Sequence, residues 1–400
     1  MNKVLVINNG STSFRFKLFD TKNYNVLASG SIENMLKDNS YFKYTNGSDN
    51  IKKSIKINNF DEIISLMEEL LIGEKLGVID SKKEIDSIGY RVVHGGEKFN
   101  KSIIIDNKSL NEIKELCELM PLHGSKIVNS IEICSNVFPN SVPVAVFDTA
   151  FHSTIPKEIY LYAIPIEYYE KYGIRKYGFH GISYNYVFNR YLNITNTKKE
   201  SYDGVICHLG GGSSLCAIKD GKSYDTTMEF TPSSGMIMAS RVGNIDPIAL
   251  FYIMQKENKS IEEIIDMMNK YSGYKALCND TDMKSIVDRS ENNDADAILT
   301  RRMIEVDFKK NLLSMMANLD RVDSIIFTGG IGTKNKEQRE MLLQNLSYYG
   351  IEIDRELNNK CFNNEMMISR HGSRIPVYVI PDDEEKEIAS ECVQLIKRRG

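Results

Sequence analysis

Short apolar runs and alternating apolar and polar residues divide the start of the chain into two segments. Val4–Ile7 is an unbroken apolar run, typical of a central strand. Phe14, Phe16 and Leu18 alternate with charged residues, which predicts a second strand. The sequence NNGSTS lies between the two segments and has the composition of a turn. The chain is therefore predicted to begin with a strand, a turn and a strand.

Helical spacing appears in the next part of the chain. The segment Asp61–Leu71 places five apolar residues on one helical face: Ile63, Ile64, Met67, Leu70 and Leu71. Asn111–Met120 has a similar pattern, and strands are predicted over Ile88–His94 and Val142–Phe147. The first 150 or so residues are therefore expected to form an α/β unit.

A second unit is predicted to open near Gly204, where GVICHLGGGSSLCAIKDG repeats the order of apolar strand, small-residue turn and strand. Helices are expected over Ile261–Met268 and Ala295–Leu319, and SIIFTGGIG predicts a strand that runs into a glycine-rich turn. The chain ends with a strand, a proline and a helix whose apolar residues are spaced by four: Ile388, Cys392 and Ile396. The similar openings of the two units indicate an internal duplication.

Composition narrows the class of protein. At ~100–200 residues per domain, a chain of 400 residues predicts two to three domains. The 50 basic and 54 acidic residues give a net charge of −4, which does not favour binding to nucleic acid. No apolar run approaches the ~20 residues that span a bilayer, and the N-terminus lacks the pattern of a signal peptide, so we expect a cytoplasmic protein. The seven cysteines include no CxxC pair and are expected to be reduced.

Three loops combine an apolar strand with Gly, Ser or Thr: Asn8–Ser13, Gly210–Ser214 and Thr328–Gly332. Small residues let backbone N–H groups approach phosphate oxygens, so three such loops favour a nucleotide or polyphosphate ligand. Each loop alone is also what an ordinary hairpin turn requires. None has the spacing of a Walker P-loop or a Rossmann fingerprint.

Several charged and imidazole side chains lie where the predicted strands, loops and helices begin or end. Arg91 and Arg241 can clamp a carboxylate or a phosphate, or can be surface residues. Asp148 ends an apolar run, where a carboxylate is costly unless it is paired or functional. Glu384 precedes the last helix, where it can bind Mg²⁺ or only complement the helix dipole. Five of the six histidines lie beside glycine or charged residues, although a hydrogen-bonded core position explains any single one: His94, His123, His152, His180 and His208.

Taken together, these segments resemble the acetate kinases. INNGSTS, GYRVVHGGE, VFDTAFH, KYGFHGIS, CHLGGGSS, SRVGNIDP, FTGGIG and VIPDDEE occur in the order and spacing of that family, over the whole chain. The resemblance implies an α/β, two-domain, actin-like (ribonuclease-H-like) duplicated fold with the active site in an interdomain cleft. The expected domains are residues 1–150 plus 385–400, and residues 151–384, the second of which binds nucleotide and forms a homodimer.

The resemblance also implies roles for individual residues. It assigns metal binding to Asn8 and Glu384, carboxylate binding to Arg91, and catalysis to Asp148, His180 and Arg241. The implied apolar pocket for the acyl methyl group consists of Val93, Leu122, Phe179 and Pro232. The implied nucleotide-binding residues are Arg15, His208, Leu209, Gly210, Gly211, Gly212, Asp282, Met283, Lys284, Gly330, Ile331, Gly332, Thr333 and Lys334.

This chain departs from the family pattern mainly in its donor-side loops. Arg15 stands where the family has Lys, and Gly211 stands where it has Asn. Thr333 and Lys334 replace a Glu-Asn pair, and the family motif FHGTSH reads FHGISY here, which ends in Tyr184. The motif TNEE becomes DDEE, which adds two carboxylates at Asp382 and Asp383.

The expected activity is that of a phosphotransferase: Mg²⁺-dependent, reversible, direct in-line transfer of a phosphoryl group from ATP to acetate, giving acetyl phosphate and ADP, with Mn²⁺ as the alternative metal. Acetate and ATP are the expected small-molecule partners, and no nucleic acid or membrane partner is expected. One alternative keeps the chemistry but uses propionate, or pyrophosphate as the donor. Another is a catalytically silent ligand-binding paralogue, against which the retained charged residues argue.

Overall fold

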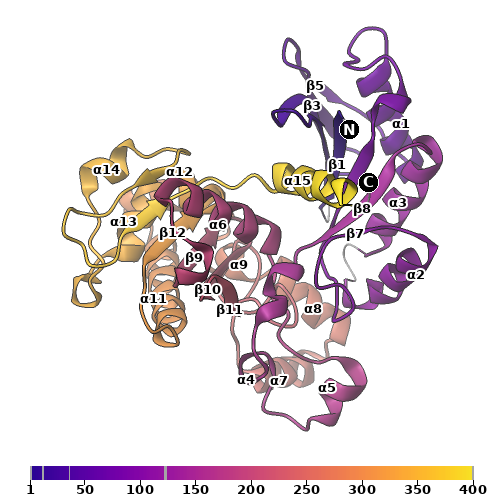
Figure 1. Ribbon diagram of the computed structural model, residues 1–400. Coiled ribbons are helices and arrows are strands. Elements are labelled where there is room, and N and C mark those ends of the chain that lie inside the picture. Colours follow the sequence, from indigo (N-terminus) through magenta and orange to yellow (C-terminus); the bar gives the residue numbers. More distant parts are fainter. Residues whose placement is uncertain (1, 11–12, 36, 121–123, 399–400) are drawn as a thin grey trace. The chain divides into compact units, whose positions relative to one another are not determined.

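The chain folds into two α/β units, each built on one mixed sheet (Figure 1). The computed structural model describes residues 2–10, 13–35, 37–120 and 124–398. Unit 1 comprises Met1–Phe151 and Asp383–Gly400, and unit 2 comprises His152–Asp382. These boundaries lie within two residues of those expected from the sequence, but they place Glu384 in unit 1, whereas the sequence analysis assigned it to the second domain.

Unit 1 contains an eight-stranded sheet in the order β5-β4-β3-β2-β1-β6-β8-β7. Its strands are β1 (Lys3–Asn9), β2 (Ser13–Asp20), β3 (Asn25–Glu33), β4 (Tyr41–Thr45), β5 (Asn50–Ser54), β6 (Ser87–Val92), β7 (Ile103–Ile104) and β8 (Val142–Phe147). Its helices are α1 (Phe60–Ile72), α2 (Asn107–Glu115), α3 (Gly124–Val137) and α15 (Glu384–Lys397), with short 3₁₀ turns at Lys82–Glu84, Leu116–Leu119 and Ala150–Thr154, the last of which crosses into unit 2.

Both faces of β1 are buried. Leu5 and Ile7 belong to the core that also contains the apolar face of α1. Val6 pairs with Gly89 of β6, and Gly89 lies against Ile388 and Cys392 of α15. Since alternate side chains of a strand point to opposite faces, α15 covers the face opposite α1. This double burial explains the unbroken apolar run of β1.

Unit 2 contains a six-stranded sheet in the order β11-β10-β9-β12-β14-β13. Its strands are β9 (Gly204–Leu209), β10 (Ser213–Lys219), β11 (Lys222–Thr226), β12 (Ser324–Thr328), β13 (Met366–Met367) and β14 (Val377–Val379). Its helices are α4 (Lys157–Tyr160), α5 (Glu167–Tyr172), α6 (Gly181–Thr195), α7 (Pro247–Glu257), α8 (Ile261–Lys270), α9 (Gly273–Cys278), α10 (Met283–Glu291), α11 (Ala295–Ala317), α12 (Gly329–Lys334), α13 (Lys336–Leu343) and α14 (Arg355–Lys360), with 3₁₀ turns at Lys199–Ser201 and Ser347–Tyr349.

The two sheets share one central pattern. In unit 1, β2 pairs antiparallel with both β3 and β1, and β6 pairs parallel with both β1 and β8. In unit 2, β11-β10-β9-β12-β14 pair in the same sequence of directions. The predicted duplicated actin-like fold is therefore confirmed, together with the strand–turn–strand opening of each unit.

Two local predictions were wrong. The helix expected over Asn111–Met120 is α2, which begins at Asn107 because Asp106 caps it through the Ser109 amide, and which gives way to a 3₁₀ turn after Glu115. The glycine-rich turn expected after SIIF is a short helix, α12. Gly329, the first residue of α12, has a φ of +76°, a conformation that suits glycine and lets the helix begin directly after β12.

No helix within the described part of the chain is long and apolar enough to cross a membrane. All seven cysteines are free thiols, as the sequence predicted, and six of them are buried.

Candidate functional site

Strand register gathers one group of predicted site residues inside unit 1. Arg91 lies two residues beyond Gly89 on β6, and so on the sheet face covered by α15. Asn8 lies on the same face of β1. Val146 of β8 pairs with Arg91, and Asp148, two residues after Val146, continues on the same face. Glu384 begins α15 itself. We call Asn8, Arg91, Asp148 and Glu384 the Arg91 cluster.

Arg91 contacts every other member of this cluster. Its Nε and Nη2 donate to Asp148 Oδ2 at 3.1 and 2.8 Å. Its Nη1 donates to Asn8 Oδ1 at 3.4 Å and lies 3.0 Å from Glu384 Oε2. Burial alone would lower the pKa of Arg91, but the carboxylates of Asp148 and Glu384 outweigh burial and raise it. The guanidinium therefore stays charged and can serve as a fixed fork for a carboxylate.

Asp148 is 1% exposed, and its second oxygen, Oδ1, has no hydrogen-bond partner among the described residues. A buried carboxylate oxygen without a partner costs free energy unless a ligand satisfies it. Asn8 and Glu384 each place a further oxygen atom, which could bind a metal ion, beside the same guanidinium. Oxygen donors of this kind suit Mg²⁺, which commonly uses one or two carboxylates and completes its shell with water and phosphate oxygens.

A second ion group on α15 was not identified from the sequence. Lys17 of β2 lies 3.1 Å from Glu385 and 3.6 Å from Asp383. Burial would raise the pKa of the Glu385 carboxyl, but Lys17 lowers it overall. The alternation in β2 had shown that Lys17 lies on the opposite face from Phe16, yet only the return of α15 to unit 1 brings these residues together.

Arg15 is not part of the Arg91 cluster. It sits opposite Asn8 in the β1–β2 pairing, but its side chain is 56% exposed and lies 3.7 Å from Glu33. Ser11 and Thr12 of the first small-residue loop lie outside the described residues, as do Leu122 and His123.

Unit 2 brings together a second group of predicted residues. The rings of His180 and His208 stack with centroids 4.1 Å apart. A Cβ atom built on Gly212 would lie 3.2 Å from Arg241 Nη1 and 3.3 Å from His180 Nε2. The two nitrogen groups thus converge on one point above the loop after β9, and only glycine leaves that point open. Arg241 Nη1 also donates to the Pro232 carbonyl at 3.1 Å.

Three polar residues that the sequence analysis did not select support these histidines. Ser214 Oγ lies 2.8 Å from His180 Nδ1 and 2.6 Å from the Tyr184 hydroxyl. Ser183 Oγ lies 2.8 Å from His208 Nδ1 and donates to Asp382 at 3.2 Å. Serine is too common for its type to reveal such a role; the helical i, i+4 spacing of His180 and Tyr184 was the available signal.

His152 and His94 occupy the core positions that the sequence analysis gave as the alternative. His152 is fully buried between Ser223 Oγ, at 2.8 Å, and the Phe179 carbonyl, at 2.9 Å. Burial lowers the pKa of His152 to about 4 and that of His94, also fully buried, to about 4. Both imidazoles are therefore neutral near pH 7.

Two of the predicted nucleotide-binding stretches are neighbours in unit 2. β9 and β12 are adjacent and parallel, and His208 pairs with Thr328, so the loops after both strands leave the same edge of the sheet. Gly329 lies against the backbone of Leu209, and Gly211 and Gly330 face open space. Thr333 is turned inward instead, because its hydroxyl bonds to the Gly329 carbonyl and to Asn363.

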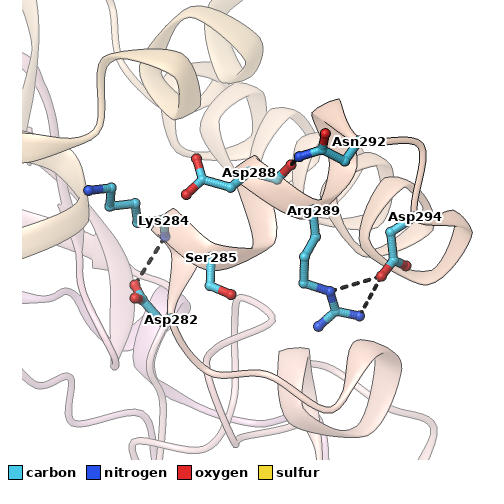
Figure 2. Close-up of a pocket in the computed structure, with 7 residues that line it drawn as sticks. All are labelled: Asp282, Lys284, Ser285, Asp288, Arg289, Asn292 and Asp294. Atoms are coloured by element: carbon cyan, nitrogen blue, oxygen red, sulfur yellow. Dashed lines mark hydrogen bonds and ion pairs between the residues drawn. The ribbon is translucent and has the colours of Figure 1, made fainter.

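The third stretch, Asp282–Lys284, borders a cavity of about 460 Å³. Figure 2 shows Lys284 and Asp288 on one side of α10 and Arg289 with Asp294 on the other. Met283 is buried in the core of unit 2 and does not line the cavity. The cavity is lined by Asp282, Lys284, Ser285, Asp288, Arg289, Asn292 and Asp294.

The residues of the implied methyl pocket fall in different units. Val93 belongs to unit 1, whereas Phe179 and Pro232 belong to unit 2, where Phe179 is buried. The carbonyls of both unit 2 residues accept bonds from side chains already described, Phe179 from His152 and Pro232 from Arg241.

Comparison with known proteins gives one consistent result. The model of the acetokinase family matches residues 3–390. The acetate kinase of Thermoanaerobacterium thermosaccharolyticum is 41% identical over 397 residues, which cover 99% of each chain. The crystal structure of Porphyromonas gingivalis acetate kinase superimposes with a TM-score of 0.93 at 33% identity, covering 99% of this chain and 100% of that one. A propionate kinase from Francisella tularensis gives a TM-score of 0.92 at 35% identity, covering 98% and 99%. The chain belongs to the acetokinase family.

Proposed function

We propose that this protein is an acetate kinase that transfers the terminal phosphoryl group of ATP to acetate, reversibly, giving acetyl phosphate and ADP. The observation that carries the proposal is the Arg91 cluster, in which a half-buried guanidinium is held by carboxylates and keeps its charge. Membership of the acetokinase family supports the same reaction. The chemistry brings two anions together, so positioning and positive charge supply most of the catalysis.

In this proposal Arg91 binds the acetate carboxylate through its positive charge and the guanidinium N–H groups not directed at Asp148, since the Nε and Nη2 atoms already donate to that side chain. Asp148 acts on Arg91 rather than on a proton, because it accepts from two guanidinium nitrogens and fixes the plane of the group. A general base is unnecessary, since acetate is already ionised at pH 7. The methyl group is assigned to Val93, Leu122, Phe179 and Pro232, and the expected interdomain cleft remains a prediction.

His180 and Arg241 are assigned to the phosphoryl group. Their nitrogen atoms converge beside Gly212, which leaves room for phosphate oxygens at that point. Hydrogen-bond donors aimed at one position are suited to the charge that spreads over the equatorial oxygens in the transition state. The loops after β9 and β12 are assigned to the ATP phosphates, and the cavity beside α10 to the nucleoside.

Asn8, Glu384 and the free oxygen of Asp148 are the residues that would hold Mg²⁺, or Mn²⁺ in its place. Counting the Lys17 group with the Arg91 cluster, two cations face four carboxylates, so the formal charge is −2. A bound divalent cation supplies the positive charge that this anion-binding region lacks. Within the described residues no group of three or more His, Cys, Asp or Glu side chains is arranged to hold a metal alone, so water and phosphate would complete the shell.

The proposed enzyme is a homodimer formed through unit 2. Helix α7 buries none of its residues within the chain, and Ile248, Phe251 and Tyr252 on it are 67%, 62% and 59% exposed. Ile261 on the neighbouring α8 is 61% exposed. Exposed apolar residues gathered in this way are typical of a protein interface.

Phe251→Glu should yield monomers in sedimentation velocity, whereas Ile194→Glu on α6 should leave the dimer intact. A dimeric Phe251→Glu variant would contradict the assignment.

The direct test is a hydroxamate assay for acetyl phosphate with Mg²⁺ and, in turn, ATP, GTP and pyrophosphate. We expect acetyl phosphate with ATP, and kcat/KM values for ATP and GTP within about tenfold, because Gly211, Thr333 and Lys334 replace the polar residues of the family's donor-side loops. Absence of acetyl phosphate with every donor would overturn the proposal and favour a silent paralogue.

Acceptor choice is tested in the same assay. One methylene changes binding by only ~1–3 kcal/mol, so propionate should remain a usable substrate and butyrate should be poorer than acetate. Butyrate turnover equal to that of acetate would contradict the assigned methyl pocket.

A further inference from the structure

We propose that Tyr184, acting through Ser214, fixes the tautomer of His180 so that its Nε2 carries the proton and faces the phosphoryl position. The inference rests on the proposed function only for the role of His180. The hydrogen-bond chain itself is a property of unit 2, formed by α6, which carries Tyr184, and β10, which carries Ser214. Tyr184 stands at the last position of FHGISY, where the acetate kinase motif has His.

The chemistry of Tyr184, Ser214 and His180 decides which residue donates in each hydrogen bond of this series. Tyr184 is fully buried, and burial, as the largest cause, raises the pKa of its phenol well above the usual value, so the hydroxyl keeps its proton. The backbone amide of His208, which can only donate, also hydrogen-bonds to this phenol. The phenol proton is therefore directed at Ser214 Oγ, 2.6 Å away.

Ser214 then has one proton left to give. Ser214 is fully buried, and among the described residues its Oγ bonds to the Tyr184 hydroxyl and, at 2.8 Å, to His180 Nδ1. Because the phenol donates to this oxygen, the Ser214 proton would be buried without an acceptor unless it is donated to Nδ1. A neutral imidazole carries one N–H, and with Nδ1 accepting, the proton must be on Nε2. His180 Nε2 is the atom that converges with Arg241 Nη1 on the space beside Gly212. Both groups thus present N–H donors to that space, even when His180 is neutral.

The stacked neighbour has the opposite arrangement. Ser183 donates its proton to the Asp382 carboxylate, so it can only accept from His208 Nδ1, 2.8 Å away. Nδ1 of His208 therefore carries a proton that Ser183 accepts, whereas Nδ1 of His180 accepts the proton of Ser214. The two rings stack at 4.1 Å but have separate serine partners, so His208 serves as an internal reference in the same molecule.

The experiment is ¹⁵N-histidine NMR of the full-length protein near pH 8, with the six histidines assigned by single His→Gln variants. We expect His180 with its proton on Nε2 and His208 with its proton on Nδ1. Tyr184→Phe removes the donor that orients Ser214, so His180 should become a mixture of tautomers while His208 is unchanged. The kcat for acetyl phosphate formation should fall about tenfold, with KM for acetate within twofold of the parent.

Tyr202→Phe is the matched control, because Tyr202 is also a fully buried tyrosine of unit 2 bonded to a serine, Ser324 Oγ at 2.9 Å. It should leave the His180 tautomer and kcat unchanged. Ser214→Ala, a second variant in case Tyr184→Phe does not fold, should reproduce the mixture of tautomers. A parental His180 with its proton on Nδ1, or a Tyr184→Phe variant with parental tautomer and kcat, would overturn the proposal. An inactive parent with the expected tautomer would instead refute the proposed function and leave the hydrogen-bond chain standing.

Discussion

At the scale of single residues, the chemistry proposed for unit 1 depends on one half-buried guanidinium, that of Arg91. Arg91 donates to Asp148 and Asn8 and forms an ion pair with Glu384, which come from three separate stretches of the chain. A buried ion pair of this kind adds little net stability, since desolvation offsets the attraction. The ion pair instead keeps the Arg91 guanidinium charged and fixes the orientation of its plane.

Arg91→Ala should lower kcat/KM by about a thousandfold, or about 4 kcal/mol, because it removes a charge-assisted fork from the site. Arg91→Lys should also be poor, since an ammonium cannot present two parallel donors. Steady-state kinetics with acetate and ATP measures the effect. Arg190→Ala is the control: it removes an equally well-formed pair, with Glu365, from the surface of unit 2. Near-parental kcat/KM in Arg91→Ala would contradict the assignment.

Substitutions at the adjacent glycines Gly211 and Gly212, in the loop after β9, should have opposite effects on activity. A side chain at Gly211 meets no atom within 4 Å, so Gly211→Asn should be tolerated, and its amide can donate to a phosphate oxygen. One such bond is worth about 1 kcal/mol, so kcat/KM for ATP should rise about fivefold. At Gly212 a methyl group would approach Arg241 and His180, so Gly212→Ala should reduce activity. Unchanged ATP kinetics in Gly211→Asn would show that this loop does not contact the phosphates.

At the scale of elements, α15 connects the fold to the site. Its first turn supplies Glu384 and Glu385, and its buried face packs on β1 and β6 through Ile388 and Cys392. Asp383 caps the helix by accepting from the Lys386 amide at 3.1 Å. Because the packing sets the axial position of the helix, it also sets where these carboxylates stand.

Gly89→Ala tests that packing. Its Cβ would lie 2.5 Å from Ile388 Cγ2 and 2.8 Å from Cys392 Sγ, so these two side chains, or the helix that carries them, must shift. Overpacking of this kind costs ~1–3 kcal/mol. Urea unfolding should show the loss, and KM for acetate should rise as Glu384 moves. Ser390→Ala, a substitution on a half-buried position of the same helix, should change stability by less than ~0.5 kcal/mol. Parental stability in Gly89→Ala would mean that α15 packs less tightly than described.

The resemblance to the acetate kinases singled out all four members of the Arg91 cluster, but only the strand register and the return of α15 bring them together. The sequence could not predict which side chains face a ligand. Met283 and Thr333 lie in predicted nucleotide stretches, yet Met283 is a core residue and the Thr333 hydroxyl bonds back to the Gly329 carbonyl of its own helix. Lys17 was missed because its partners lie on α15, distant in sequence, and Ser214 because only the fold places it between Tyr184 and His180.

At the scale of the whole molecule, both units contain a buried neutral histidine, and this makes the fold sensitive to acid. The pKa of His94 in unit 1 and of His152 in unit 2 is lowered to about 4 by burial. In the unfolded chain each titrates near its ordinary value of ~6.5. Above that pH both states are neutral. Between about 6.5 and 4 only the unfolded state takes up the protons, so stability falls as pH falls.

Each histidine should therefore cost up to about 3 kcal/mol of unfolding free energy by pH 4. Urea unfolding from pH 7.5 to 4.5 should show stability decreasing below pH 6.5. His152→Gln should make the pH dependence of unit 2 shallower, and His371→Gln, on the surface, should leave it unchanged. A flat profile between pH 6.5 and 4.5 would show that the buried imidazoles accept protons without unfolding.

The return of α15 to unit 1 also has a consequence during synthesis on the ribosome. The N-terminal sheet is made first, but the helix that covers one face of β1 and β6 is made last, after all 231 residues of unit 2. Until then the nascent chain carries an uncovered apolar face on that sheet. Unit 2, continuous in sequence, can complete its core first, so the N-terminal sheet should depend on chaperones until α15 has been made.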